Sequence, residues 1–164
     1  PGSFKKFLDL IGSRQITEFN YRYTDSKEAD IFVGATIQNR AEALALLKTL
    51  NQQGIKTIDL HDNEMAKLHI RHMVGGRAQA DNEVLYRFEF PERPGALRNF
   101  LNAIGGQWNI SLFHYRNHGA DYGRVLVGLQ VPPQDKAALQ RFLRKLGYPY
   151  TEESANPAYR MFLR

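Results

Sequence analysis

Large apolar residues recur with helical spacing near the start of the chain. They lie at positions i, i+3, i+4 and i+7 of one short segment: Phe4, Phe7, Leu8 and Ile11. This spacing places all four side chains on one face of a helix. Pro1 suits a first helical turn, and Gly12 suits the left-handed residue that ends a helix. The pattern predicts a helix over residues 1–12 with one buried face.

The same pattern returns later in the chain, so the sequence contains a duplicated unit. PGALRNFLNAIG at 94–105 aligns with PGSFKKFLDLIG at 1–12 at an offset of 93 residues. After one inserted residue the offset becomes 94, and ISLFHYRN at 110–117 aligns with ITEFNYRY at 16–23. Chance agreement at so steady a spacing is implausible. The chain is therefore two copies of one α/β unit.

Each copy continues with two β-rich runs that are separated by turn-forming residues. The predicted strands are 16–23 and 30–37 in the first copy and 110–117 and 122–131 in the second. They are rich in Val, Ile, Phe and Tyr, which favour a pleated, half-buried surface.

A second amphipathic helix follows the two strands of each copy. The predicted helices, 40–53 and 135–146, carry leucine at helical spacing, and each ends at a glycine. We expect a closing strand after each helix. We then expect a short turn and a further extended run, at 68–74 in the first copy and at 159–164 in the second.

Upstream of the second Pro-Gly turn lies one more strand, EVLYRFEFPER at 83–93. It gives the second copy the order β-α-β-β-α-β of split ferredoxin-like folds. No such strand precedes Pro1, so we expect a piece of a longer protein. The fold class is α+β, two tandem ferredoxin-like subdomains, the first lacking its leading strand. We place them at 1–75 and 84–164, with a polar linker at 76–83.

Composition narrows the classes of function. The chain has 164 residues, 43% of them hydrophobic, which is enough for a packed core. It has no cysteine, no secretory signal and no apolar run near the roughly 18 residues that span a bilayer. These features favour a cytoplasmic protein without membrane contact. The net charge is +5, but the cations are scattered among 17 acids, which indicates a solvated surface rather than a nucleic-acid-binding stripe.

Five segments together resemble one known family: EFPERPGAL, NISLFHYRNHGADYGRVL, TEFNYRY, DNEMAKLH and NPAYRMF. They are similar to the C-terminal regulatory region of biosynthetic threonine deaminase (threonine dehydratase), over essentially the whole chain. The resemblance implies two ACT-like subdomains behind a pyridoxal-phosphate-dependent catalytic domain that lies outside this chain. It also implies that isoleucine binds here and inhibits the enzyme, and that valine opposes this. The implied partners are both amino acids and the catalytic domain, in a homo-oligomer, with no cofactor in this chain.

The two Pro-Gly turns are candidate ligand sites. A glycine lets the backbone approach a ligand closely, and the helix start beside it offers N–H groups and a positive dipole end to a carboxylate. The candidate residues are Gly2, Ser3 and Phe4 in the first copy and Gly95, Ala96 and Leu97 in the second. A plain structural turn is the alternative, because duplication preserves packing as well as sites. The resemblance matches Phe4 and Leu97 to positions that line effector sites, although core packing explains them equally well.

Tyr21 and Tyr115 occupy the same place in the two copies of an F-x-Y-R motif. In a strand, Phe and Tyr share one face and Arg points to the other. A phenol beside the Pro-Gly turn supplies an apolar wall and a hydrogen bond, and the resemblance assigns these tyrosines to the effector sites. We expect Arg22 and Arg116 to form surface or interface ion pairs instead. If only one pocket works, we expect it to be that of Gly95 and Tyr115.

Nothing in the sequence predicts catalysis or metal binding. His69 and His72 share a face only on a helix, and their run is predicted to be extended, while a turn separates His114 from His118. Neither pair has a convincing carboxylate partner for a metal. No Ser-His-Asp or paired-carboxylate arrangement stands out. We therefore expect no catalytic residue and no metal in this chain.

Two other functions stay open. The split fold is shared with the RRM class of RNA-binding modules, and IFVGATI resembles its shorter strand signature, but the aromatic partner signature is missing. The second is an ACT-type amino-acid sensor attached to another enzyme. An effector acts through different affinities for two arrangements. We expect these to differ by rotation of the two copies about a hinge near Gly75 and Gly76.

Overall fold

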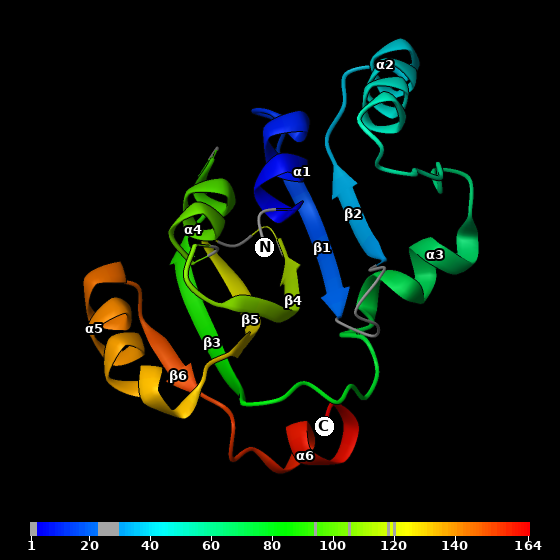
Figure 1. Ribbon diagram of the computed structural model, residues 1–164. Helices are drawn as coiled ribbons and strands as arrows, with labels where there is room; N and C mark the ends of the chain where they lie inside the picture. The colour runs from blue at the N-terminus through cyan, green and yellow to red at the C-terminus, as the bar shows by residue number, and fades with distance from the viewer. Residues whose placement is uncertain (1–2, 23–29, 94, 105, 118, 120) are drawn as a thin grey trace.

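One antiparallel sheet of six strands runs through both copies of the repeat, in the order β2-β1-β4-β5-β3-β6 (Figure 1). The computed structural model describes residues 3–22, 30–93, 95–104, 106–117, 119 and 121–164. The strands are β1 (Ile16–Arg22), β2 (Ile31–Ala35), β3 (Glu83–Pro91), β4 (Asn109–Arg116), β5 (Tyr122–Gln130) and β6 (Tyr150–Glu152). The first copy supplies β1 and β2, and the second supplies the other four.

Six α-helices and two short 3-10 helices complete the described part of the chain. The α-helices are α1 (Ser3–Ile11), α2 (Arg40–Gln52), α3 (Glu64–Leu68), α4 (Ala96–Ile104), α5 (Lys136–Leu146) and α6 (Pro157–Phe162). The 3-10 helices are η1 (Ile70–His72) and η2 (Pro133–Asp135). The amphipathic helices predicted at both Pro-Gly turns are thus present as α1 and α4.

The two copies meet along β1 and β4, which are equivalent strands of the repeat. The central register pairs are Phe19 with Tyr115, Asn20 with His114 and Tyr21 with Phe113. Asn20 and His114 are also equivalent in sequence, at the offset of 94 residues. Each copy therefore presents the same motif to the other in opposite directions, and a local twofold axis passes between Asn20 and His114.

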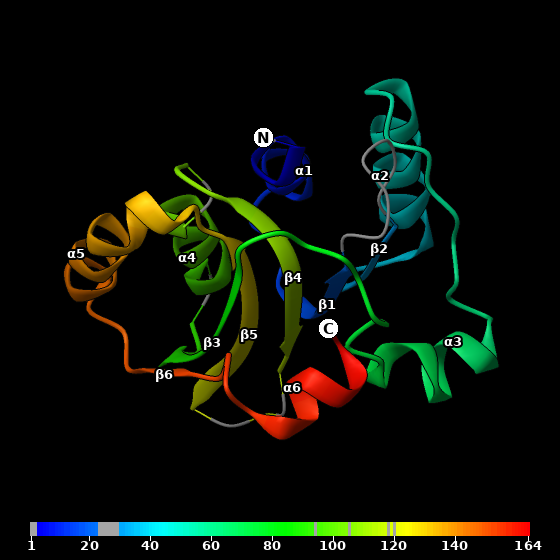
Figure 2. The same ribbon diagram turned by 60° about the horizontal axis from the view of Figure 1, so that its bottom comes forward.

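The main hydrophobic core lies on the face of the sheet that α1, α2, α4 and α5 cover (Figure 2). Aromatic rings connect the two copies there. The Phe19 ring lies 5.9 Å from that of Phe7 and 5.6 Å from that of Phe113, and Phe100 in α4 lies 6.4 Å from Phe113, all between ring centroids. Because edge and tilted contacts of this kind favour close packing, the junction between the copies is part of the core itself.

The opposite face of the sheet carries a smaller core and a polar layer. Figure 2 shows α6 crossing this face in front of the strands. Leu85 and Leu112 pack there with Tyr159 of α6. The segment that contains η1 joins them, because the Asn20 side-chain amide donates to the carbonyl of Arg71, at 3.2 Å. The C-terminal helix and the inter-copy segment therefore both cover the second face.

The structure confirms the α+β class and its two tandem units, and it corrects two expectations about connecting segments. The runs 68–74 and 159–164 are not extended, because α3 and η1 occupy the first and α6 the second. Both α-helices begin at an asparagine whose side chain accepts a backbone N–H, Asn63 from Ala66 and Asn156 from Ala158. Such caps stabilise short helices that periodicity does not reveal.

The closing strand is present in the second copy as β6, but the one expected in the first copy is wrong. β6 hydrogen-bonds to β3, and the described part of the first copy contains no counterpart of β3. Residues 55–60 follow α2 without pairing to a neighbouring strand. Instead, the N–H of Ile55 donates to the carbonyl of Leu50 at 2.9 Å and that of Thr57 to Oδ1 of Asn51 at 3.2 Å, so the segment is tied to the end of α2 rather than to the sheet.

Candidate functional site

A cavity of about 640 Å³ lies between the end of α1 and the start of α4. Leu8, Ile16 and the loop 12–15 form its first-copy wall. The second-copy wall runs from Glu92 into α4. It also includes Tyr115, near the end of β4, and Asn117, directly after that strand. A volume of this size accommodates a small molecule, and a mixed apolar and polar lining is typical of ligand sites.

The cavity brings together three of the residues that the sequence singled out in the second copy. Gly95, Leu97 and Tyr115 all line it. Ala96, the fourth, is a buried residue in the first turn of α4. Gly95 of the turn and Tyr115 of the strand thus line the same cavity, as expected. That these residues bind an effector stays a prediction.

The four candidates of the first copy are placed less completely. Gly2 lies outside the described residues, and so do the side chains of Ser3 and Phe4, although their backbones belong to α1. Tyr21 is buried in β1, opposite Phe113 of β4. The local twofold axis makes Tyr21 the structural equivalent of Tyr115.

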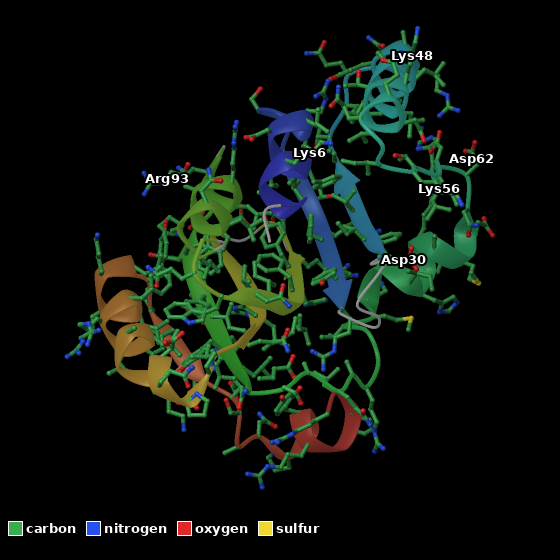
Figure 3. The ribbon with its side chains drawn as sticks, viewed as in Figure 1. Lys6, Asp30, Lys48, Lys56, Asp62 and Arg93 are labelled. Atoms are coloured by element: carbon green, nitrogen blue, oxygen red, sulfur yellow. The ribbon has the colours of Figure 1, made fainter. Side chains whose placement is uncertain are left out.

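Gly95 shapes the entrance to α4. Its φ is +81°, a left-handed conformation in which a side chain is strained. The carbonyl of Gly95 accepts the N–H of Asn99 at 2.9 Å, and the N–H of Ala96 donates to the carbonyl of Arg93 at 2.9 Å. The backbone therefore enters α4 through a tight turn, and the positive end of the α4 dipole lies at the cavity. Arg93 lies exposed beside this turn (Figure 3).

Tyr115 is held through both its ring and its hydroxyl. The ring stacks on Phe90, with 6.1 Å between centroids, and only 1% of the residue is exposed. Its hydroxyl donates to Oε1 of Glu92 at 2.5 Å. Burial, and then this hydrogen bond, raise the pKa of Tyr115 above its ordinary value. The phenol is therefore a neutral donor with a fixed direction.

Sequence reasoning missed Glu92 and the first-copy wall. Glu92 belongs to the quoted EFPERPGAL segment, and its place directly before the Pro-Gly turn was the available signal. Leu8 and Ile16 carry no such signal, since their place in the cavity depends on how β1 aligns with β4.

Two arginines of the cavity wall are engaged in ion pairs. Nε of Arg14 lies 2.8 Å from Oε1 of Glu42, and Nη1 of Arg14 donates to the carbonyl of Ile11 at 2.8 Å. Nη2 of Arg98 lies 2.7 Å from Oδ1 of Asp9. These contacts connect the α1 region with α2 and α4 around the cavity, so both guanidinium groups already have a carboxylate partner.

The arginines of the F-x-Y-R motifs point to the opposite face, as predicted. Arg22 pairs with Glu83 through Nη1 and Oε1 at 2.5 Å, and only 3% of each side chain is exposed. It also donates to the carbonyl of Leu163, and at 3.3 Å to that of Gly76. Arg116 donates to Nδ1 of His72 at 2.5 Å. The first of these contacts is thus a buried interface ion pair between the copies.

The second face also corrects the expectation for the histidines. His72 lies in η1 and His69 directly precedes it, so their run is helical rather than extended. Within the described residues, no three His, Asp or Glu side chains gather closely enough to hold a metal ion. None of the helices described for the chain has the length and apolar character needed to cross a membrane.

Comparison with known proteins decides the family. The sequence matches the C-terminal regulatory domain of threonine dehydratase over residues 1–70 and 74–163. The chain belongs to this family. It is 59% identical to the L-threonine dehydratase biosynthetic IlvA of Burkholderia multivorans and 52% identical to that of Escherichia coli, in each case over 99% of this chain and 32% of the relative. It is 43% identical to the mitochondrial threonine dehydratase of Saccharomyces cerevisiae, over 100% of this chain and 30% of the relative.

This chain of the threonine dehydratase family spans about a third of the length of these relatives. It corresponds to their C-terminal regulatory region. The match covers both copies of the repeat and so does not favour an RRM-type RNA-binding module, the alternative that the split fold left open.

Proposed function

We propose that this regulatory domain binds branched-chain amino acids in the cavity between α1 and α4, with isoleucine as feedback inhibitor and valine as opposing effector. The lining of the cavity supports this. Leu8, Ile16 and Leu97 offer an aliphatic surface, and Glu92 and the start of α4 offer polar groups at one side. A branched-chain amino acid has the same division between an apolar side chain and a charged head group.

The observation that carries the proposal is the convergence of both copies on this one cavity. Gly95 and Tyr115 come from the second copy, and Leu8 and Ile16 come from the first. A ligand that contacts both walls binds more tightly to one arrangement of the copies than to another, which is the requirement for an allosteric effector.

A second, equivalent site follows from the local twofold axis. Gly2, Ser3, Phe4 and Tyr21 of the first copy would form one wall, with the start of β4 facing them. Two sites that differ in sequence are able to differ in affinity, which suits two opposing effectors. We expect the site of Gly95 and Tyr115 to be the stronger, because its wall continues upstream into Glu92.

The catalytic domain that the regulatory domain controls is a proposed partner outside this chain, in a homo-oligomer. The pyridoxal phosphate implied by the family would belong to that domain. A cofactor of this kind needs a lysine in an enclosed site. The described lysines, among them Lys6, Lys48 and Lys56, are exposed, and no described lysine lines the cavity (Figure 3). The described residues of this chain therefore do not fit the cofactor.

Titration calorimetry with isoleucine and valine tests the proposal. We expect saturable heat with both, and a loss of about tenfold or more in isoleucine affinity in Tyr115→Ala, which removes a buried ring and a hydroxyl from the cavity wall. Tyr122→Ala is the matched control, since Tyr122 is 61% exposed and lies outside the cavity. Absence of heat and of any thermal shift with either amino acid would overturn the proposal.

A further inference from the structure

The C-terminal helix α6 crosses the second face of the sheet and ends near the segment that joins the two copies (Figure 2). The chain before α6 is tied to β3, because the N–H of Glu153 donates to the carbonyl of Leu85 at 2.7 Å and the N–H of Leu85 donates to Oγ of Ser154 at 3.0 Å. Leu163, directly after the helix, and Val74 of the inter-copy segment both pack against the smaller core. The helix therefore reaches from the second copy to the connection between the copies.

One buried carboxylate beneath α6 joins three other parts of the chain. Glu83 begins β3, and only 3% of its side chain is exposed. Its Oε1 accepts from Nη1 of Arg22 at 2.5 Å and from the hydroxyl of Ser111 in β4, and its Oε2 accepts from the Tyr159 hydroxyl of α6 at 2.6 Å. A buried charge is stable only where donors surround it. The first copy, β4 and α6 are therefore connected through the same group.

The neighbouring strand β5 leaves room for this network at Gly128, which pairs with Leu85 and Leu112. A Cβ atom at position 128 would lie 2.7 Å from Oγ of Ser111 and 2.8 Å from Oε1 of Glu83, which is too close for a carbon atom. The backbone of Gly128 is not in the left-handed region that favours glycine. The buried network therefore accounts for a glycine inside a strand, where this residue ordinarily weakens the sheet.

Arg22 extends the network from Glu83 to the linker. Its Nε donates to the carbonyl of Gly76 at 3.3 Å, and its Nη2 donates to the carbonyl of Leu163. The Leu163 carbonyl also accepts the N–H of Ala78 at 3.4 Å. The linker and the end of α6 are therefore bound to one another and to the same guanidinium group.

The equivalent helix of the first copy, α3, differs at the position that makes this contact. Ala66 lies 93 residues before Tyr159, and each is the third residue after the asparagine that caps its helix. An alanine has no hydroxyl to donate to a carboxylate. Arg116, the equivalent of Arg22, contacts His72 near solvent instead. The contact of α6 with the network is therefore specific to the second copy and is not required by the packing of the repeat.

We propose that α6 is a strap that locks the relative arrangement of the two copies, with Tyr159 fastening it to the network of Glu83 and Arg22. While the strap is closed, the linker carbonyl of Gly76 is held and the copies do not turn about the linker. Release of α6 frees the linker, so that a second arrangement of the copies becomes populated.

Distances between spin labels test the strap, measured by double electron–electron resonance in the 164-residue chain. The chain has no cysteine, so pairs of introduced cysteines are labelled specifically. Lys48→Cys in α2 (Figure 3) with Arg141→Cys in α5 reports on the two copies, since both positions are exposed. Ala103→Cys in α4 with Arg141→Cys is the matched pair within the second copy.

Tyr159→Phe removes the hydroxyl that donates to Glu83 and keeps the ring in the smaller core. We expect it to raise the population of a second distance between the copies by about tenfold relative to the main one, as for loss of one hydrogen bond to a charged group. Tyr159→Ala also removes the ring and should raise this population further. Tyr122→Phe is the control, because Tyr122 is 61% exposed, and it should leave the distances unchanged.

An unchanged distance distribution between the copies in both folded Tyr159 variants would overturn the inference. An equal broadening in the pair within the second copy would overturn it as well, because it would indicate general loosening rather than release of a strap. If Tyr159→Ala does not fold, Tyr159→Phe decides alone. The test needs no effector, so a chain that binds neither isoleucine nor valine would contradict the proposed function and leave the strap to be judged by its distances.

Discussion

The two copies of the repeat differ most in their second helix. In α5, Leu143 is 1% exposed, and the helix packs into the main core beside β3 and β6 (Figure 1). In α2 the equivalent Leu50 is also buried, but Leu46, the counterpart of the buried Leu139, is only partly buried, and Leu44 is 53% exposed. The second helix is therefore well buried in the second copy and partly exposed in the first. In the second copy, β4 and β5 have a strand on either side, whereas in the first copy β2 is an edge strand of the sheet.

The first copy makes extensive contacts with the second. β1 pairs with β4, α1 lies against α4, and the buried Arg22 pairs with Glu83 across the junction. An ordinary linker would leave two such units free to turn. Here the linker is packed as well, since a Cβ atom at Gly75 would lie 2.6 Å from Cβ of Arg22. Any movement between the copies therefore has to disturb the buried Arg22 side chain and its ion pair with Glu83.

Replacement of the two motif arginines is expected to give the largest difference in stability. Arg22→Met should reduce the free energy of unfolding by about 3–5 kcal/mol, because Glu83 is then buried without its cation. The equivalent Arg116→Met should cost less than about 1 kcal/mol, since Arg116 contacts His72 near solvent.

Urea unfolding followed by circular dichroism measures both variants. Adding Glu83→Gln to Arg22→Met should recover part of the lost stability, because the unpaired charge is removed. Equal costs for the two arginines would show that the junction depends on both motifs alike and would contradict the contrast between the copies.

A matched pair of leucines tests the two helices directly. Leu139 and Leu46 lie eight residues before the glycines that end α5 and α2. Leu139 is 2% exposed, so Leu139→Ala should cost about 3 kcal/mol through lost burial and a residual cavity. Leu46 is only partly buried, and Leu46→Ala should cost about 1 kcal/mol. A larger loss for Leu46 in thermal or urea unfolding would reverse the ranking of the copies.

The fold was predictable where hydrophobic periodicity and the repeat coincide. Phe7, Leu8 and Ile11 predict the buried face of α1, and the alignment of F-x-Y-R motifs predicts which side chains of β1 and β4 share a face. The short helices α3 and α6 were not predicted, since five or six residues give little periodicity. Asn156 followed by Pro157 was a usable signal, because it combines a cap with a favoured first helical residue.

The candidate site was predictable only within one copy. Gly95 and Tyr115 follow from the turn and the strand motif, and both line the cavity. Leu8 and Ile16 come from the other copy, and their contribution depends on the antiparallel register of β1 and β4, which no local pattern specifies. Glu92 was missed because its place in the cavity wall depends on the contact with the Tyr115 hydroxyl, which comes from a different strand.

The C-terminal helix offers a smaller test of the same contrast. Tyr159 of α6 is buried, and its hydroxyl donates to Oε2 of Glu83 at 2.6 Å. Tyr159→Phe should cost about 1–2 kcal/mol, because Glu83 loses a donor while the ring is kept. In α3 the corresponding buried residue after the capping asparagine is Ala66, and Ala66→Gly should cost about 1 kcal/mol through helix propensity. Urea unfolding measures the stability of both variants. A larger loss of stability in Ala66→Gly than in Tyr159→Phe would contradict the view that the second copy is the more tightly packed.

The smallest expected effect concerns pH at the contact between His72 and Arg116. Desolvation, and then the nearby Arg116 and Arg71, lower the pKa of His72 below its ordinary value. The folded chain therefore favours neutral His72, which accepts from Arg116 through Nδ1. This contribution to stability is present above the unfolded pKa of about 6.5 and is lost as the pH falls through the lower folded pKa.

Acidification from neutral pH to about 5 should thus lower the melting temperature of the unaltered chain more than that of His72→Gln, which cannot become charged. His61→Gln serves as the control, because the His61 side chain is 72% exposed and lies away from the junction between the copies. Identical acid sensitivity in all three proteins would mean that this outer contact contributes nothing to holding the copies together. The buried ion pair between Arg22 and Glu83 would then be the polar connection between the copies that matters on this face, and Arg22 would contribute far more to stability than Arg116.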